Sequence, residues 1–284
     1  MGYVYILLWV IGFSVFQLFP LIMSFLYSFT DYSVGKAFQV VGFSNYITAL
    51  TRDKEVTNSL RVTFTYVALS VPLKLVFALF IAMLMNMKIR GMKVFRTIYY
   101  LPSILGGSVA VAILWRHIFA HSGVVNQILG SLGLRPVGWL TSPDMALFTI
   151  SLLSVWQFGS SMVIFLAALK QVPGELYEAA SIDGSGKVRS FFRITLPMIS
   201  PMILFNLIMQ MINAFQEFTA PKIITNGGPM KSTNLYGLLL YQNAFSFFKM
   251  GYASAMSWIM FAIIIAFTAL VFRSAGYWTY YGDE

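Results

Sequence analysis

The stretch EAASIDGSGKVRSFFRITLP, residues 178–197, lies between two long hydrophobic runs and guides the interpretation of the whole chain. Pro173 suits the first turn of a helix, and Glu175 and Glu178 favour a helix N-terminus. Small apolar residues follow at helical spacing until Gly184, which ends the helix. The pattern predicts a short amphipathic helix, followed by a basic segment that leads into the next hydrophobic run.

The composition of this 284-residue chain is that of a membrane protein. Hydrophobic residues make up 58% and charged residues only 10%, whereas a soluble domain carries roughly 25% charged residues. The chain has no cysteine, and its two histidines, His117 and His121, form no cluster, so we expect no metal site. The net charge of +9 is typical of basic membrane loops and gives no reason to expect nucleic-acid binding.

Hydrophobic runs predict the number of membrane spans, since each span needs about 20 mostly apolar residues. The first run is longer than the roughly 7–15 residues of a signal-peptide core, so we interpret it as a true span. No basic residue precedes it, and we expect a native cytoplasmic tail before it. The sequence predicts an all-α integral membrane protein, one domain over residues 1–284, with spans at 3–29, 60–87, 97–118, 145–169, 199–222 and 252–273.

Basic residues predict the orientation of these spans. A count over all loops is a tie, so the short loop after the second span decides. That loop holds cations and no acid, namely Lys88, Arg90, Lys93 and Arg96. We therefore expect a multi-pass protein of the bacterial cytoplasmic (inner) membrane, with both termini and the loop 170–198 inside.

One segment imitates a nucleotide-binding motif. Gly184-Ser185-Gly186-Lys187 looks like the end of a P-loop, which requires G-x-x-x-x-G-K-[ST]. Ser181 stands at the first glycine position and Val188 at the last position. The chain is thus not expected to bind ATP through this loop, and another chain must hydrolyse ATP if ATP drives it.

The spacing from Glu178 through Gly184 to Pro197 resembles the EAA loop of permease subunits from binding-protein-dependent ABC importers. Further motifs, in the same order along nearly the whole chain, resemble the carbohydrate-type permeases related to the maltose importer. These motifs are Phe19-Pro20, Ser28–Tyr32, Gly42–Tyr46, Arg90–Arg96, Leu101-Pro102, Thr225–Pro229 and Gly251–Ala255.

The resemblance implies a six-helix permease fold with a cytoplasmic coupling helix. It also implies a second, homologous permease chain, two ATPase subunits that bind ATP and Mg, an extracytoplasmic solute-binding protein and a carbohydrate ligand. Glu178, Ala179, Ala180 and Gly184 are the expected ATPase-coupling residues. The alternative is an interfacial helix that lies on the membrane lipid, and the full EAA-loop spacing favours coupling.

The resemblance also implies a ligand cavity near the middle of the third, fourth and fifth spans. On this sequence the implied substrate-pathway residues are Ser103, Trp156, Gln157, Asn213, Gln216 and Glu217. Polar side chains within a membrane usually face a bundle interior or an aqueous cavity, which agrees with this placement. Trp156 has two interpretations, stacking on a sugar ring or packing in the core.

Lys74 is the most unusual residue, because it lies in the middle of the second span. An unpaired charge there costs at least about 2.5–3.5 kcal/mol. Water in a cavity, a carboxylate partner between subunits or within the bundle, such as Glu217, or an anionic ligand must offset that cost. An anionic ligand predicts an acidic substrate such as a uronate oligosaccharide, and a neutral sugar or polyol remains the alternative.

Two other classes of protein are compatible with many spans. A membrane-embedded enzyme acting on lipid-linked sugar needs a cluster of acid, base or metal-binding groups, and the sequence shows none. A secondary transporter usually shows inverted repeats, which we do not find. We therefore expect a translocation subunit that performs no covalent chemistry and works by alternating access.

Overall fold

The computed structural model describes residues 2–35, 37–87 and 91–280. Lys88 and Arg90, which we used for the orientation, lie outside the described residues, as does the side chain of Lys93. The described chain is helical, with one isolated β-bridge between Thr30 and Val40. It divides into a first unit, Met1–Leu60 with Tyr236–Ile265, and a second unit, Arg61–Leu235 with Ala266–Glu284.

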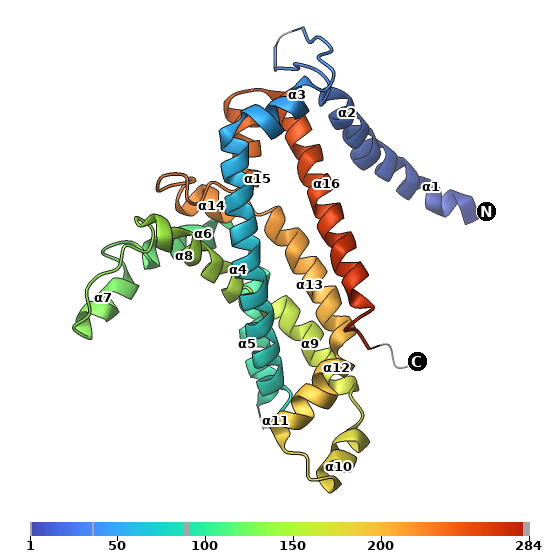
Figure 1. Ribbon diagram of the computed structural model, residues 1–284, viewed down its shortest axis with the longest axis vertical. Coiled ribbons are helices and arrows are strands. Elements are labelled where there is room, and N and C mark those ends of the chain that lie inside the picture. Colours follow the sequence, from blue (N-terminus) through green and yellow to red (C-terminus); the bar gives the residue numbers. More distant parts are fainter. Residues whose placement is uncertain (1, 36, 88–90, 281–284) are drawn as a thin grey trace. The chain divides into compact units, whose positions relative to one another are not determined.

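The first unit contains the N-terminal helices and the segment that follows residue 235 (Figure 1). Two long helices, α4 (Lys54–Met85) and α16 (Met250–Ala275), begin in this unit and continue into the second. Its other helices are α1 (Gly2–Phe13), η1 (Ser14–Leu18), α2 (Phe19–Tyr27), α3 (Ser44–Ile47), η2 (Thr48–Arg52), α15 (Tyr236–Tyr241) and η4 (Gln242–Ser246).

Hydrogen bonds in the first unit join motifs that are far apart in the sequence. The Asn45 side-chain amide donates to the carbonyls of Ser28 and Thr30 at 2.9 and 2.8 Å. The Gly251 N–H donates to the Tyr32 carbonyl at 2.8 Å, and a Cβ at Gly251 would collide with the Thr30 carbonyl. The segments 28–32, 42–46 and 251–255 therefore form one cluster, and Gly251 permits the close approach.

Two tyrosine hydroxyls form further hydrogen bonds in the first unit. The Tyr252 hydroxyl donates to Asp53 Oδ2 at 2.7 Å, and the buried Tyr236 hydroxyl donates to the Met256 carbonyl at 2.9 Å. Burial, with a smaller effect of the Asp53 charge, raises the pKa of Tyr236 above its ordinary value. Tyr236 therefore remains a protonated hydrogen-bond donor.

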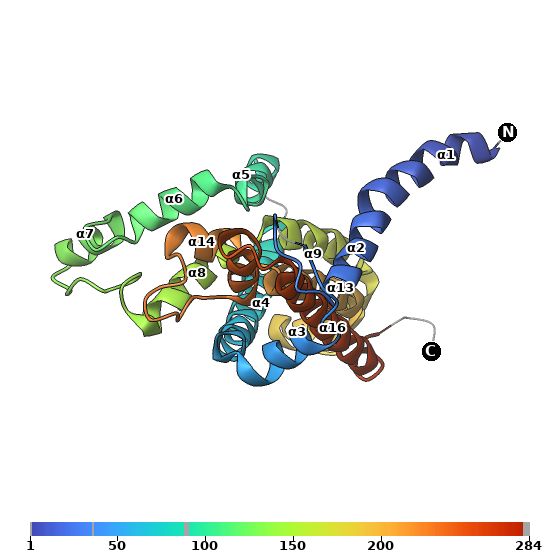
Figure 2. The same ribbon diagram turned by 90° about the horizontal axis from the view of Figure 1, so that it is seen from above.

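The second unit holds most of the broken helices. Its elements, besides the later parts of α4 and α16, are α5 (Met92–Leu105), α6 (Val109–Ile118), α7 (Val124–Ser131), α8 (Pro143–Trp156), α9 (Gly159–Gln171), α10 (Gly174–Ile182), α11 (Lys187–Ser190), η3 (Phe191–Thr195), α12 (Leu196–Met198), α13 (Ser200–Phe215) and α14 (Thr219–Ile224). Figure 2 shows α6 turning away from the axis of α5 and continuing toward α7.

Three of the described helices are long and apolar enough to cross a membrane, namely Ile6–Tyr27, Lys54–Met85 and Met250–Ala275. Three helix pairs pass the same test only together, and the count is six if each pair is one span. These pairs are Val94–Leu105 with Val109–Ile118, Pro143–Trp156 with Gly159–Gln171, and Lys187–Met198 with Ser200–Ile224, bent by 102°, 48° and 67°.

The observed helices differ from the predicted runs at the start of the second span, and the third, fourth and fifth predicted runs are each broken into two helices. The helix α4 begins at Lys54, earlier than the predicted residue 60. The predicted run at 97–118 is two helices, because Gly107 adopts a left-handed φ of 75° and Ser108 caps α6 by accepting the Val111 N–H at 3.3 Å. Hydropathy alone does not detect such a break, since Gly106 and Gly107 are not polar.

The core of the second unit is apolar and fills the space beside α4, α9 and α13. We call one part of it the α4–α9 apolar cluster. This cluster consists of Ala78, Ile81, Ala82, Phe165, Leu166 and Leu169, all buried. Ile203 and Leu207 of α13 pack against the same core, in which the α4–α9 apolar cluster occupies the part between the middle of α4 and its Met85 end.

Candidate functional site

A polar cavity of about 320 Å³ lies where three helices of the second unit are broken. The breaks are those between α5 and α6, α8 and α9, and α13 and α14. Irregular backbone at membrane depth is tolerated where it lines a cavity. The wall consists of Tyr66, Lys74, Ser103, Gly106, Gly107, Ser154, Gln157, Ser160, Gln210, Asn213, Ala214 and Glu217.

Ser103 holds the break between α8 and α9. Its hydroxyl donates to the Gln157 carbonyl at 3.1 Å and accepts the Ser160 N–H at 3.1 Å, so it pairs two backbone groups that a continuous helix would satisfy. A Cβ at Gly106 would lie 3.0 Å from Gln157 Cδ, so the absence of a side chain at Gly106 leaves room for the Gln157 side chain. The first two breaks are therefore packed against each other.

Glu217 organises the third break. Its Oε1 accepts the N–H groups of Phe218 and Ala220 at 3.1 and 3.0 Å, and it thereby caps the start of α14. Among the described residues that line the cavity, Glu217 is also the only carboxylate. One residue thus supplies both a structural cap and a negative charge.

Lys74 supplies the positive charge of the cavity wall and is only 9% exposed. Lys74 and Glu217 attract each other electrostatically. The part of the chain that the structure describes shows no direct ion pair between them. The cavity therefore holds two opposite charges, and a ligand between them would meet both.

Five of the seven predicted pathway residues line this cavity, namely Lys74, Ser103, Gln157, Asn213 and Glu217. Trp156 and Gln216 are not among the lining residues. Trp156 packs against the apolar core, with its ring centroid 6.1 Å from that of Trp115, as its packing interpretation predicts. Gln216 is exposed at the end of α13.

Sequence reasoning missed four polar residues of the wall, Tyr66, Ser154, Ser160 and Gln210. Each is a polar side chain inside a predicted span, which is the signal that could have found them. Gln210 lies one helical turn before Asn213 and is 8% exposed. Small serines are common in membrane helices, so polarity alone would not have separated Ser154 from a packing residue.

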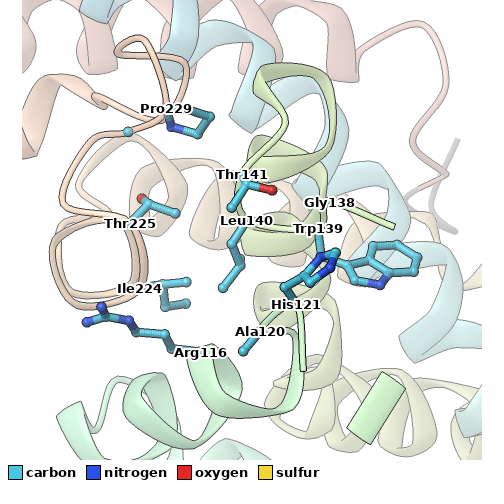
Figure 3. Close-up of a pocket in the computed structure, with 11 residues that line it drawn as sticks. Arg116, Ala120, His121, Gly138, Trp139, Leu140, Thr141, Ile224, Thr225 and Pro229 are labelled. Carbon is cyan, nitrogen blue, oxygen red and sulfur yellow. The ribbon is translucent and has the colours of Figure 1, made fainter. Parts of the chain in front are cut away.

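A second cavity, of about 530 Å³, lies beside α6 and α14 (Figure 3). Figure 3 shows Trp139 and His121 on one side of it, with Ile224, Thr225 and Pro229 on the other. Its lining includes Arg116 but none of the predicted pathway residues. It also draws on the predicted outside segments 119–144 and 223–251, whereas predicted pathway residues line the smaller, more polar cavity.

The predicted short helix is present as α10, and we call residues 173–197 the EAA segment. The helix ends in a Schellman motif, with Ser185 N–H donating to Ala180 at 2.8 Å and Gly184 N–H to Ser181 at 3.1 Å. Gly184 adopts a φ of 73°, a left-handed conformation that glycine reaches without strain. The glycine therefore sets the end of the helix and the direction of the chain after it.

The EAA segment is exposed but internally braced. Figure 1 shows α10 beyond the ends of α9 and α12 within the second unit. The Tyr177 hydroxyl lies 2.8 Å from Thr195 Oγ1 and joins α10 to the segment that leads into α13. Ile182 is 87% exposed and Val188 is 73% exposed, an arrangement typical of a surface that a partner covers.

Helices fit for a membrane, a polar cavity at their breaks and an exposed, braced amphipathic helix define a subunit of a membrane transporter. Among the described residues, no group of three His, Cys, Asp or Glu side chains is placed to hold a metal ion. The arrangement can bind and release a polar solute, and it offers a separate surface to a partner.

Comparisons with known proteins agree with this class. The model of the family described as binding-protein-dependent transport system inner membrane component matches residues 46–278. The chain is 49% identical over 286 aligned positions to the probable ABC transporter permease protein YesP of Bacillus subtilis, covering 100% of this chain and 93% of that protein. It is 36% identical over 240 positions to the sulfoquinovosyl glycerol transport system permease protein SmoG of Agrobacterium fabrum, covering 84% and 78% of the two chains.

A solved structure shares the fold. A chain of a bacterial ABC transporter involved in the import of the acidic polysaccharide alginate matches with a TM-score of 0.82 and 22% identity, over 96% of this chain and 94% of that chain. This chain belongs to the family of inner membrane components of binding-protein-dependent transport systems.

The predicted class is thereby confirmed. The chain is an all-helical permease subunit of a carbohydrate ABC importer in the inner membrane, a translocation component and not an enzyme. ATP is hydrolysed on separate subunits. The roles of the individual coupling and pathway residues remain predictions.

Proposed function

We propose that this permease moves an acidic carbohydrate, such as a uronate oligosaccharide, through the polar cavity by alternating access. The observation that carries the proposal is the Lys74 ammonium, a buried charge on the wall of a cavity made by three helix breaks. A charge at this depth is retained only if something offsets its desolvation, and a carboxylate on the ligand does so. Glu217 favours the alternative, a neutral sugar or polyol, because it offsets part of the Lys74 charge itself.

The names of two relatives support an anionic ligand. SmoG is a permease for sulfoquinovosyl glycerol, and UgpA of Yersinia enterocolitica, 34% identical over 244 residues and 84% of this chain, is a permease for sn-glycerol-3-phosphate. Sulfonate and phosphate groups are anionic at neutral pH, as uronate carboxylates are. A carbohydrate with a negative charge is therefore within the range of ligands that such permeases carry.

The substitution Lys74→Gln tests the proposal in the assembled transporter. If Lys74 contacts the substrate, half-maximal stimulation of ATPase activity by a uronate oligosaccharide should need about tenfold more substrate, for about 1.4 kcal/mol of lost contact. Lys74→Arg keeps the charge and is the matched control, with a smaller expected effect. An unchanged half-maximal concentration in a less thermostable Lys74→Gln complex would make Lys74 a structural partner of Glu217 and favour the neutral ligand.

We also propose the assembly in which the subunit works. The exposed α10 supports docking to an ATPase through Glu178, Ala179 and Ala180, with ATP and Mg bound on two such subunits. A second, homologous permease chain and an extracytoplasmic binding protein complete the complex, and a related solved transporter is in complex with a periplasmic protein. Both termini and the EAA segment face the cytoplasm in this arrangement.

Cysteine labelling tests the orientation cleanly, because the chain has no native cysteine. In intact cells, a membrane-impermeant thiol reagent should modify Met230→Cys, which is 88% exposed, and spare Lys187→Cys. Opening the membrane should make Lys187→Cys reactive. Modification of Lys187→Cys in intact cells would reverse the orientation, and purification of the complex without an ATPase would remove the coupling role of α10.

A further inference from the structure

Asn206 of α13 has a buried polar side chain without a hydrogen-bond partner among the described residues. It is 0% exposed, and no described residue forms a hydrogen bond with its Oδ1 or its Nδ2. Buried amides are almost always hydrogen-bonded, and each orphaned atom destabilises the fold. An amide with both atoms orphaned inside a membrane helix therefore needs an explanation.

The position of Asn206 on α13 connects it with the cavity. Asn206, Gln210 and Asn213 follow each other at helical spacing, so they lie on one face of the helix. Gln210 and Asn213 line the cavity, and Glu217 continues the same row just beyond the helix end. The polar row of the cavity thus extends to Asn206, roughly 10 Å along the axis from Asn213 at 1.5 Å per residue.

The opposite face of α13 is apolar and packed. Leu204 and Ile208, two residues to either side of Asn206, pack in a cluster with Ala275 of α16. Because residues two apart on a helix point in nearly opposite directions, Asn206 faces away from that contact. Its neighbours along the chain, Ile203 and Leu207, pack against the core that contains the α4–α9 apolar cluster.

The direction of the helices shows where Asn206 lies relative to the cavity. From the cavity wall, Lys74 on α4 is followed by Ala78 and Ile81, and Ser160 on α9 is followed by Phe165 and Leu169, toward the EAA segment. On α13 the same direction runs from Asn213 back to Asn206. Asn206 is therefore on the EAA-segment side of the cavity, the same side as the α4–α9 apolar cluster.

We propose that Asn206 is an inner station of the translocation pathway, that is, a ligand-contacting residue on the EAA-segment side of the polar cavity. When α4, α9 and α13 separate on the EAA-segment side, its amide becomes accessible and donates to and accepts from hydroxyl groups of the passing carbohydrate. The helices close over it in the arrangement described here, which leaves the amide unpaired and favours reopening. This inference rests on the proposed pathway through the polar cavity.

Single-cysteine accessibility separates the inference from the proposed function. In the transporter assembled with its ATPase, 2-aminoethyl methanethiosulfonate applied from the EAA-segment side should modify Asn206→Cys in the nucleotide-free state. Trapping with ATP and vanadate should slow the modification at least tenfold. Leu204→Cys, buried on the opposite face, is the matched control and should stay unmodified in both states.

The outcomes differ for the two ideas. If Gln210→Cys reacts but Asn206→Cys is as inert as Leu204→Cys in both states, the inner station is wrong and the cavity pathway stands. If Gln210→Cys is also inert in both states, the proposed pathway itself fails. Reaction of Asn206→Cys in the nucleotide-free state alone supports the inference.

A second variant tests whether Asn206 is merely a structural residue with a hidden water. Asn206→Leu keeps the branched shape of the side chain and replaces both orphaned polar atoms by methyl groups, so the thermal stability of the complex should rise. The maximal transport rate should nevertheless fall about fivefold, with the half-maximal substrate concentration unchanged, and Asn206→Ser should restore part of it. A more stable Asn206→Leu transporter with an unchanged maximal rate would overturn the proposal.

Discussion

The EAA segment and the polar cavity differ in how the chain builds them. The EAA segment is built from neighbouring residues of the chain, and the hydrogen bonds that brace it join Ser185 to Ala180 and Tyr177 to Thr195 within the segment. The cavity uses residues from α4, α5, α8, α9 and α13, and its wall runs from Tyr66 to Glu217. One change in backbone conformation can therefore disrupt the EAA segment. Single substitutions in the cavity wall are instead expected to have graded effects on transport.

The largest expected effect is at Gly184. Its φ of 73° costs a residue with a side chain about 1–2 kcal/mol, and a β-branched side chain fits this conformation worst. Gly184→Val should therefore break the Schellman motif, redirect the chain after α10 and reduce uptake into membrane vesicles more than tenfold. Ligand capture by the binding protein should be unaffected.

Matched controls distinguish backbone geometry from bulk at this site. Gly184→Asn should keep most of the uptake, because asparagine adopts the left-handed conformation more readily than other residues. Gly186→Ala should be nearly neutral, since Gly186 has a φ of −73° and open space around its Cβ position. Full uptake by the Gly184→Val transporter would mean that the end of α10 does not matter for coupling.

This difference explains how much of the molecule could be predicted. The helix α10, its end at Gly184 and the class of protein follow from consecutive residues, so the sequence indicates them directly. The cavity depends on breaks that meet in three dimensions, and Ser103 is recognisable as a partner of Gln157 and Ser160 only when those breaks are placed. Trp156 is an aromatic residue of the kind that stacks on sugar rings, but in the structure it packs against Trp115 and the apolar core.

The orphaned amide of Asn206 was beyond sequence reasoning for another reason. Its type and position suit a packed helix interface as well as a pathway, because asparagine often forms hydrogen bonds between membrane helices. Only the absence of a partner among the described residues separates the two alternatives. Whether a polar atom is paired depends on how the helices pack, so the amino-acid sequence alone does not reveal it.

The smallest expected effect, and the sharpest on the cavity, concerns Glu217. Glu217→Gln keeps an oxygen that can accept the N–H groups of Phe218 and Ala220, so the start of α14 should be preserved while the charge is lost. If the substrate is an anion, removal of this repulsion should lower the half-maximal concentration for ATPase stimulation about threefold, or about 0.7 kcal/mol.

Glu217→Ala removes the cap as well and should lower the stability of the complex by about 1 kcal/mol, which measures the structural contribution of the cap. The double variant Lys74→Gln/Glu217→Gln completes a cycle in the half-maximal substrate concentration: independent contacts with the substrate give additive changes in free energy, whereas coupling between the two side chains makes the double variant depart from the sum of the single changes. A weaker response of Glu217→Gln to a uronate than the unaltered transporter shows would instead indicate that Glu217 accepts hydroxyl groups of a neutral sugar, and the cavity would then be a site for uncharged ligands.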